Sequence, residues 1–209
     1  MAKDKIDLKK SLKHLYQASP KEVAMIEVPR CQYLQVEGRG DPNTVPAFPQ
    51  AAEVLFRVSY TLKFLVKKEA GPDYAVMPLE GLWYAEDLAA FSLDRRDQWQ
   101  WTLMILQPDF ITREALARAV AEVRKKNGSP LLDALRLAPF SEGQAAQILH
   151  VGPYHDEAPT IARLHRFIRD KGYHFCGKHH EIYLNDPRRT APERLKTIIR
   201  QPITLEAMK

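Results

Sequence analysis

The order of the expected secondary-structure elements is the feature that most restricts the fold of this chain. Residues 22–107 give a strand, a break containing glycine, a helix and two further strands, and residues 141–202 repeat this order. Each module is much longer than the roughly 20–50 residues of a solenoid repeat, so the pattern indicates duplicated modules. We therefore expect an α+β fold made of two strand–helix–strand–strand modules.

Hydrophobic periodicity places the elements of the first module. The strand pattern of residues 22–37 ends at a turn formed by residues 38–42, and a helix follows over residues 46–68. Two strands come next, at residues 74–84 and 99–107. The helix carries one apolar stripe in steps of three and four residues, formed by Phe48, Ala51, Leu55, Val58, Leu62 and Leu65.

The second module repeats these signals. A strand over residues 144–151 breaks at a Gly-Pro turn, and a helix follows over residues 157–171. Strands are expected at residues 178–185 and 195–201. A helix on one face of a three-stranded sheet buries only that face, so we expect the modules to pair about a pseudo-two-fold axis. A ligand cleft would then lie between them.

The remaining segments flank or join the modules. Residues 1–21 are polar with leucines at helical spacing, which predicts an N-terminal arm docked on the body. Residues 112–127 predict a helix that begins at a threonine cap. Residues 108–140 are therefore expected to be a helical connector, and residues 203–209 a tail.

Composition limits the class of protein. The 209 residues suffice for a hydrophobic core, and the two cysteines are too few for a disulfide framework. The chain has neither an 18-residue apolar run nor a signal-peptide pattern, so we expect a cytoplasmic protein without membrane contact. The net charge is +5, but the basic residues are dispersed and form no nucleic-acid-binding motif. We therefore do not expect the protein to bind nucleic acid.

The strand at residues 178–185 holds the strongest candidate for chemistry. Alternation puts one set of side chains on each face: His179, Glu181 and Tyr183 on one, and His180, Ile182 and Leu184 on the other. A carboxylate between an imidazole and a phenol could act as a general base or acid, or as the counter-charge of a cationic ligand. The alternative is an exposed strand residue.

Aromatic residues of the first module predict an apolar wall. Trp101 lies on a strand next to that of Trp83, and a flat surface of this kind suits a planar or cationic ligand; the alternative is ordinary core packing. Glu80 occupies the first module's counterpart of the Glu181 strand. Strict alternation puts Glu80 and Trp83 on opposite faces, whereas a bulge at Gly81 would bring them together.

Other motifs give no cofactor or metal. The cluster of His174, Cys176, His179 and His180 lacks a second group of ligands and zinc-motif spacing, so we expect no metal site. The glycines at residues 38–40 lack the spacing of a dinucleotide or phosphate loop, and we expect no cofactor.

Three motifs together resemble the GyrI-like small-molecule-binding proteins, in particular a stand-alone subgroup without a DNA-binding domain. They are Met77-Pro78-Leu79-Glu80-Gly81-Leu82-Trp83, the strand that begins at Trp101, and His180-Glu181-Ile182-Tyr183-Leu184-Asn185-Asp186-Pro187-Arg188, and the resemblance covers about residues 20–202. It implies the duplicated fold and a central cleft for hydrophobic, often cationic molecules. Relatives are effector domains of drug-sensing regulators, one inhibits DNA gyrase, and some stand-alone members hydrolyse cyclopropane-bearing toxins of the duocarmycin and yatakemycin type.

The resemblance also implies roles for individual residues. Glu181 corresponds to the central glutamate, and we expect it to be catalytic together with Tyr154, whose phenol could donate to the ligand; Tyr74 is the alternative donor. The ligand-binding residues expected from the resemblance are Tyr74, Trp83, Trp101 and Tyr183, and the strand patterns add Glu80 and His179. The first hypothesis is an enzyme that opens a strained ring with water activated by Glu181. The alternatives are a protein that sequesters a drug-like compound without turnover and a gyrase-interacting protein.

Overall fold

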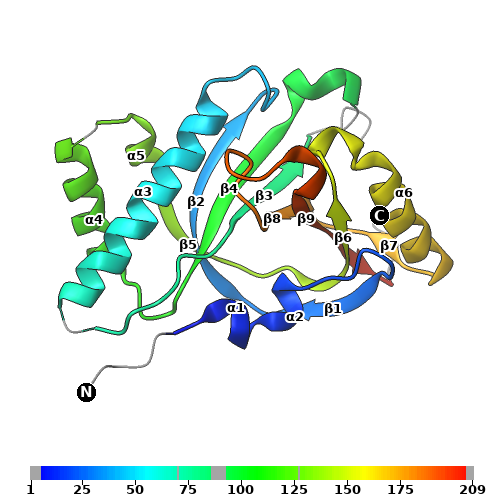
Figure 1. Cartoon of the computed structure of the whole chain (residues 1–209), viewed down its shortest axis with the longest axis horizontal. Coiled ribbons are helices and arrows are strands. Elements are labelled where there is room, and N and C mark those ends of the chain that lie inside the picture. Colours follow the sequence, from blue (N-terminus) through cyan, green and yellow to red (C-terminus); the bar gives the residue numbers. More distant parts are fainter. Residues whose placement is uncertain (1–5, 70, 86–92, 127, 206–209) are drawn as a thin grey trace. The chain divides into compact units, whose positions relative to one another are not determined.

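The structure is a computed structural model that describes residues 6–69, 71–85, 93–126 and 128–205. It combines helices with antiparallel strands, which confirms the predicted α+β class (Figure 1). Parts of the predicted arm and tail, residues 1–5 and 206–209, lie outside the described residues. The chain forms two compact units: unit 1 comprises Met1–Ser11, Cys31–Leu79 and Tyr84–Phe140, and unit 2 comprises Leu12–Arg30, Glu80–Trp83 and Ser141–Lys209.

Unit 1 is built on strand β2 (Cys31–Arg39), which pairs antiparallel with β4 (Gln100–Gln107) and β5 (Arg136–Phe140). Helix α3 (Ala47–Lys68) packs on β2 and β4, and α4 (Arg113–Lys126) packs on α3 (Figure 1). The shorter helices of this unit are α1 (Leu8–Ser11), α5 (Leu131–Ala134) and the 3-10 helix η2 (Leu93–Gln98).

The apolar stripe explains why α3 forms and where it packs. Ala51, Leu55, Val58 and Leu62 of the stripe are buried, and so is the neighbouring Val54. Since residues three and four apart share one face of a helix, this stripe can cover the apolar strands β2 and β4. The predicted helix at residues 46–68 is confirmed as α3.

Unit 2 contains a sheet in the order β1, β6, β9, β8 and β3. These strands span Ala24–Val28, Gly143–Val151, Lys196–Thr204, His179–Tyr183 and Leu79–Tyr84, and the short β7 (His174–Phe175) pairs with the end of β9. Helix α6 (Ala158–Asp170) packs on β6 and β9, and α2 (Lys13–Tyr16) contacts β1. Two 3-10 turns, η3 (Tyr154–Asp156) and η4 (Pro192–Arg194), complete the unit.

The core of unit 2 joins the buried side of α6 to the sheet. Its fully buried members come from β6, α6 and β9, and they are Ala146, Ile148, Leu164, Ile168, Ile199 and Ile203. Burying such side chains stabilises a fold by about 1.5–3 kcal/mol for each large one. This packing fixes α6, and the turn before it, on one face of the sheet.

Three parts of the fold differ from the sequence prediction. The stretch expected as one strand over residues 22–37 is two strands, because Pro29 lacks an N–H donor and the chain leaves the ladder of β6 there. Residues 74–78 are outside β3, and Tyr74 makes an isolated bridge with Ile6. Residues 136–140 of the expected helical connector are the strand β5. It tolerates Pro139 because, among the described strands, it pairs with β2 alone.

The second module follows the predicted order, with β6, α6, β8 and β9 in sequence. The pseudo-two-fold relation of the two modules and the cleft between them stay predictions. None of the helices in the described part of the chain is both long enough and apolar enough to cross a lipid bilayer.

Candidate functional site

Strand β8 lies between β9 and β3 and sends polar side chains to both faces of the sheet of unit 2. Glu181 contacts His179 and Tyr183, its neighbours two positions away, so these three share one face. His180 and Ile182 point to the other face and are fully buried. The predicted alternation along this strand is confirmed.

The Glu181 carboxylate is held in a fixed orientation. Its Oε2 accepts a hydrogen bond of 2.9 Å from the Tyr183 hydroxyl, and its Oε1 lies 3.2 Å from Nε2 of His179. The side chain is 14% exposed. Each carboxylate oxygen has two lone pairs, so each can accept one more hydrogen bond. Glu181 therefore combines low exposure with free acceptor capacity.

Trp83 extends this arrangement from the neighbouring strand β3. Its indole Nε1–H donates a 3.2 Å hydrogen bond to the Tyr183 hydroxyl oxygen, which in turn donates to Glu181. Burial, and then Glu181 and Glu157, raise the pKa of Tyr183 well above its ordinary value. Tyr183 consequently stays protonated and keeps its role as donor to Glu181 throughout the ordinary pH range.

Gly81 leaves the space for this hydrogen bond. A Cβ at this position would lie 3.0 Å from both Trp83 Nε1 and the Tyr183 hydroxyl oxygen. We expect Gly81→Ala to lower the free energy of unfolding by about 1–3 kcal/mol through overpacking. The control is Gly128→Ala, because a Cβ there meets nothing within 4 Å. Urea denaturation of both variants tests this; equal effects would contradict the tight fit at Gly81.

Tyr154 reaches the same face from the turn before α6. Its ring packs edge-on against that of Tyr183, with centroids 5.6 Å apart and an interplanar angle of 77°. His150 anchors the turn, since its Nε2 lies 3.2 Å from the Pro153 carbonyl oxygen and its Nδ1 lies 3.0 Å from Oγ1 of Thr160. Burial, followed by nearby carboxylates, raises the pKa of Tyr154 to about 12. Its phenol is therefore available as a hydrogen-bond donor at neutral pH.

We call His179, Glu181, Tyr183, Trp83 and Tyr154 the Glu181 group. All five were expected site residues, and unit 2 brings them together. Of the other expected site residues, Glu80 also belongs to unit 2 but lies on the opposite face, bound to His180. Side chains on β3 therefore alternate without the bulge considered above. Gly81 instead leaves space for the close contact between Trp83 and Tyr183.

The other two expected residues, Trp101 and Tyr74, belong to the core of unit 1. Trp101 is fully buried, packs edge-on against Phe48 with ring centroids 5.3 Å apart, and fills the space beside Gly38. Tyr74 is 1% exposed and packs against Phe110 at 5.7 Å between centroids. Both residues follow the alternative interpretation as core aromatics.

Glu157 is a site residue that the sequence analysis missed. It follows η3 directly, is 5% exposed, and interacts electrostatically with Glu181. Burial, and then the Glu181 carboxylate, raise the pKa of Glu157 to about 9. In the sequence this residue resembles an ordinary acidic side chain at a helix start, where the helix dipole favours negative charge. The proximity of Glu181 was the missing information.

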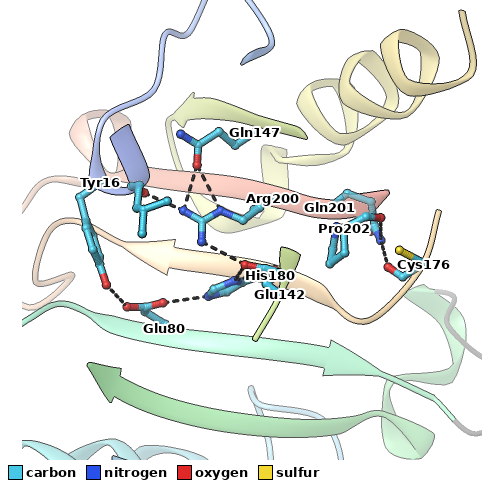
Figure 2. A network of polar contacts seen from close by, with 10 residues as sticks. Tyr16, Glu80, Glu142, Gln147, Cys176, His180, Arg200, Gln201 and Pro202 are labelled. Carbon is cyan, nitrogen blue, oxygen red and sulfur yellow. Dashed lines mark hydrogen bonds and ion pairs between the residues drawn. The ribbon is translucent and has the colours of Figure 1, made fainter. Parts of the chain in front are cut away.

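A buried network of polar side chains occupies the opposite face of β8 (Figure 2). Nε2 of His180 lies 3.0 Å from Glu80 Oε2, and Nδ1 lies 3.0 Å from Glu142 Oε1. Carboxylates only accept hydrogen bonds, so both ring nitrogens carry a proton and His180 is an imidazolium ion. Burial opposes this charge, but the two glutamates outweigh burial and raise the pKa of His180.

Arg200 of β9 continues the network toward the N-terminal segment (Figure 2). Its Nη1 donates to Glu142 Oε2 at 3.1 Å, and its Nε and Nη2 donate to Gln147 Oε1 at 3.1 and 2.9 Å. Nη2 also donates to the backbone carbonyl of Leu15 at 2.7 Å. Burial alone would raise the pKa of Glu142, but His180 and Arg200 lower it.

Tyr16 closes the network from α2, donating to Glu80 Oε1 at 2.6 Å. The network therefore joins α2, β3, β8 and β9 behind the Glu181 group. The network thus lies on the opposite face of β8, the strand that positions Glu181.

The charge state of His180 gives a pH-dependence of stability. The pKa of His180 is higher in the folded protein than its unfolded value of about 6.5. Its stabilising contribution is thus complete below about pH 6.5 and is lost as pH rises through the folded pKa. We expect the advantage in unfolding free energy of the wild type over His180→Gln to shrink across that range, measured by urea denaturation. A constant advantage up to pH 10 would contradict a charged His180.

Within the described ranges, no group of three or more His, Cys, Asp or Glu side chains is arranged to hold a metal ion. His180, part of the cluster considered above, instead faces Glu80 and Glu142.

Comparisons with known proteins show which family and which solved structures this chain resembles. The sequence profile of the GyrI-like family, described as a GyrI-like small molecule binding domain, matches residues 21–204. A solved structure of an uncharacterized conserved protein from Listeria innocua is 38% identical, with a TM-score of 0.88, and the match covers 95% of this chain and 100% of that one. For a hydrolase from the same organism the identity is 37%, the TM-score 0.85 and the coverage 96% and 100%.

A more distant similarity concerns the fold alone. The C-terminal domain of EcmrR is 15% identical with a TM-score of 0.56, over 88% of this chain and 97% of that domain. A search of curated proteins found no match.

Proposed function

Because the chain belongs to the GyrI-like family of small-molecule-binding domains, we propose that the Glu181 group binds a planar hydrophobic compound and opens a strained ring in it by adding water. The substrate class is the electrophilic cyclopropane, in which ring strain lowers the barrier that the protein must overcome. Glu181 is the general base in this proposal, and Tyr154 is a hydrogen-bond donor.

One observation supports the proposal above the others: a carboxylate of low exposure is fixed by Tyr183 and His179 beside the rings of Trp83 and Tyr154. A general base must be oriented before the reaction and must keep a free lone pair for the proton of water. Aromatic rings beside it supply apolar contact area for a flat ligand. The relative that is a hydrolase, 37% identical over 96% of this chain, supports turnover.

The proposed reaction balances with one water molecule. A water oxygen attacks a carbon of the three-membered ring while Glu181 takes one proton from that water. The ring C–C bond breaks, and its electron pair moves through the conjugated system to an oxygen of the ligand. That oxygen gains a proton, so the product is the ligand plus one water. Proton transfer to a positioned base contributes about 10²–10⁴-fold to such a rate.

Mass spectrometry tests the proposal. The purified protein is incubated with a duocarmycin-type cyclopropane compound, and the small molecule is analysed over time beside a sample without protein. We expect a mass gain of one water that depends on protein concentration. A compound that binds, as seen by quenching of tryptophan fluorescence, yet keeps its mass would contradict turnover of this class.

Binding without turnover is the second candidate, and the ring geometry favours a specific version of it. Two tyrosine rings packed edge-on beside a carboxylate form a surface that attracts organic cations. In that case Glu181 is a counter-charge, and Glu181→Gln weakens the binding of cationic compounds more than that of neutral ones of equal size. Calorimetric titration with a matched cationic and neutral pair separates the two candidates.

A further inference from the structure

A second carboxyl group, that of Glu157, interacts with the Glu181 group, and ligand packing does not explain its role. Glu157 follows Tyr154 by three residues and is 5% exposed. Both Tyr154 and Tyr183 interact electrostatically with Glu157 and with Glu181. The two carboxyl groups therefore act on the same pair of phenols, at one place in unit 2.

The hydrogen bonding of the two carboxyl groups is unequal. Each oxygen of Glu181 has a partner, Tyr183 or His179. Oε1 of Glu157 is buried and, among the residues that the structure describes, has no hydrogen-bond partner. Buried polar atoms in native proteins are nearly always paired, and an unpaired one calls for an explanation such as a catalytic role. A hydrogen-bond acceptor on a bound ligand would supply the missing partner.

The difference in hydrogen bonding determines which of the two carboxyl groups keeps a proton. Two nearby carboxylates repel each other, so one of a close pair keeps its proton. The negative charge is better stabilised on Glu181, which accepts two hydrogen bonds, than on Glu157, whose pKa is lowered by hydrogen bonding with Thr197 alone. The pKa of Glu157, raised to about 9 by burial and by Glu181, agrees with this assignment. Environments that separate the pKa values of two carboxyl groups in this way make one group an acid and the other a base.

We propose that Glu157 is the general acid of the site and that it protonates an oxygen of the bound compound while Glu181 deprotonates the attacking water. This inference rests on the function proposed above and adds the source of the second proton. The Glu157 O–H bond breaks as the ligand oxygen receives the electron pair of the opening ring. Glu181 then holds the proton taken from water, and its transfer to Glu157 through solvent restores both groups.

The assignment restricts the substrate class. The compound must carry an acceptor oxygen, such as a carbonyl, conjugated with the strained ring, because only then does the arriving electron pair reach the proton of Glu157. Tyr154, with its pKa near 12, holds its proton more firmly than Glu157 and orients the same oxygen. A cation without an acceptor oxygen would fill the site without using Glu157.

Glu157→Gln tests the inference, because the amide keeps the shape and a hydrogen-bond donor but has no acidic proton. With a duocarmycin-type compound we expect ring opening to fall by about 10²-fold or more, while the dissociation constant changes by less than about fivefold. The wild-type rate should decline as pH rises through about 9, where Glu157 loses its proton, and the variant should lack this decline. Asp156→Asn, at an exposed carboxylate of the same turn, is the matched control and should behave as the wild type.

Two results would overturn the inference while leaving the proposed function intact: a wild-type rate that stays level through pH 10, or a Glu157→Gln rate within about threefold of the wild type. Failure of the proposed function has a different signature, namely no turnover by the wild type itself. Infrared spectroscopy gives an independent readout. We expect the carbonyl band of a protonated carboxylic acid at pH 7 in the wild type and its loss in Glu157→Gln; absence of this band from the wild type would also overturn the inference.

Discussion

Glu181→Gln is expected to lower the rate of ring opening by about 10²–10⁴-fold. The amide can still accept the hydrogen bond of Tyr183, so the strand and the neighbouring rings keep their places, but it cannot take a proton from water. The dissociation constant for a neutral planar compound should therefore change by less than about threefold, because apolar contacts with the aromatic rings dominate its binding. Rate is followed by mass spectrometry under single-turnover conditions, and affinity by tryptophan fluorescence.

Glu193→Gln is the control for this variant, since Glu193 is exposed in η4 and the chemical change is the same. It should match the wild type in both measurements. If Glu181→Gln instead lost affinity for the neutral compound in proportion to its rate, Glu181 would be a binding residue and the base would have to be sought elsewhere.

Arg200→Met is expected to lower the free energy of unfolding by about 3–5 kcal/mol. Arg200 is 1% exposed, and its loss removes the Nη1 donor of Glu142 and every guanidinium donor to Gln147 Oε1 and the Leu15 carbonyl. A buried carboxylate deprived of a partner is costly, because water cannot replace that partner. Urea denaturation at pH 7 measures the effect.

The matched control is Arg194→Met, at an exposed position of η4 shortly before β9. Its unfolding free energy should stay within about 0.5 kcal/mol of the wild type, as for most surface substitutions. A loss of less than about 1 kcal/mol in Arg200→Met would show that the network behind β8 is dispensable for stability.

Sequence periodicity was sufficient for the elements that depend on local pattern. The stripe of α3 and the alternation of β8 follow from the 3.6-residue and two-residue periods, and both are observed. Periodicity gave the faces of Glu181 and His180 correctly for the same reason. Periodicity alone did not separate β1 from β2, although Pro29, which cannot donate a hydrogen bond to a ladder, was a sequence signal for that break.

Tyr16 and Arg200, which the sequence analysis missed, belong to the buried network behind β8 and have partners that are distant along the chain. Tyr16 and Glu80 are 64 residues apart, and Arg200 and Leu15 are 185 residues apart. One local signal was present: Arg200 follows Ile198 and Ile199 within an expected strand, and a charged residue in a buried strand requires a partner.

Sequence patterns also could not distinguish aromatic residues near the site from aromatic residues of the core. Trp83 and Trp101 both lie in strands with apolar neighbours. Trp83 nevertheless donates a hydrogen bond to Tyr183, whereas Trp101 packs against Phe48. Which of them faces a ligand is decided by tertiary packing, and sequence alone left both interpretations open.

The most direct test of the central claim, that Glu181 activates water, is a single turnover in water labelled with ¹⁸O. The wild type, in excess over a duocarmycin-type compound, is mixed with it in labelled water, and product and protein are both analysed by mass spectrometry. If Glu181 acts as a base, the oxygen added to the product is ¹⁸O and the protein keeps its mass. If the product carries unlabelled oxygen and the protein gains the label, the Glu181 carboxylate itself attacks the ring, and the proposed role of Glu181 is wrong.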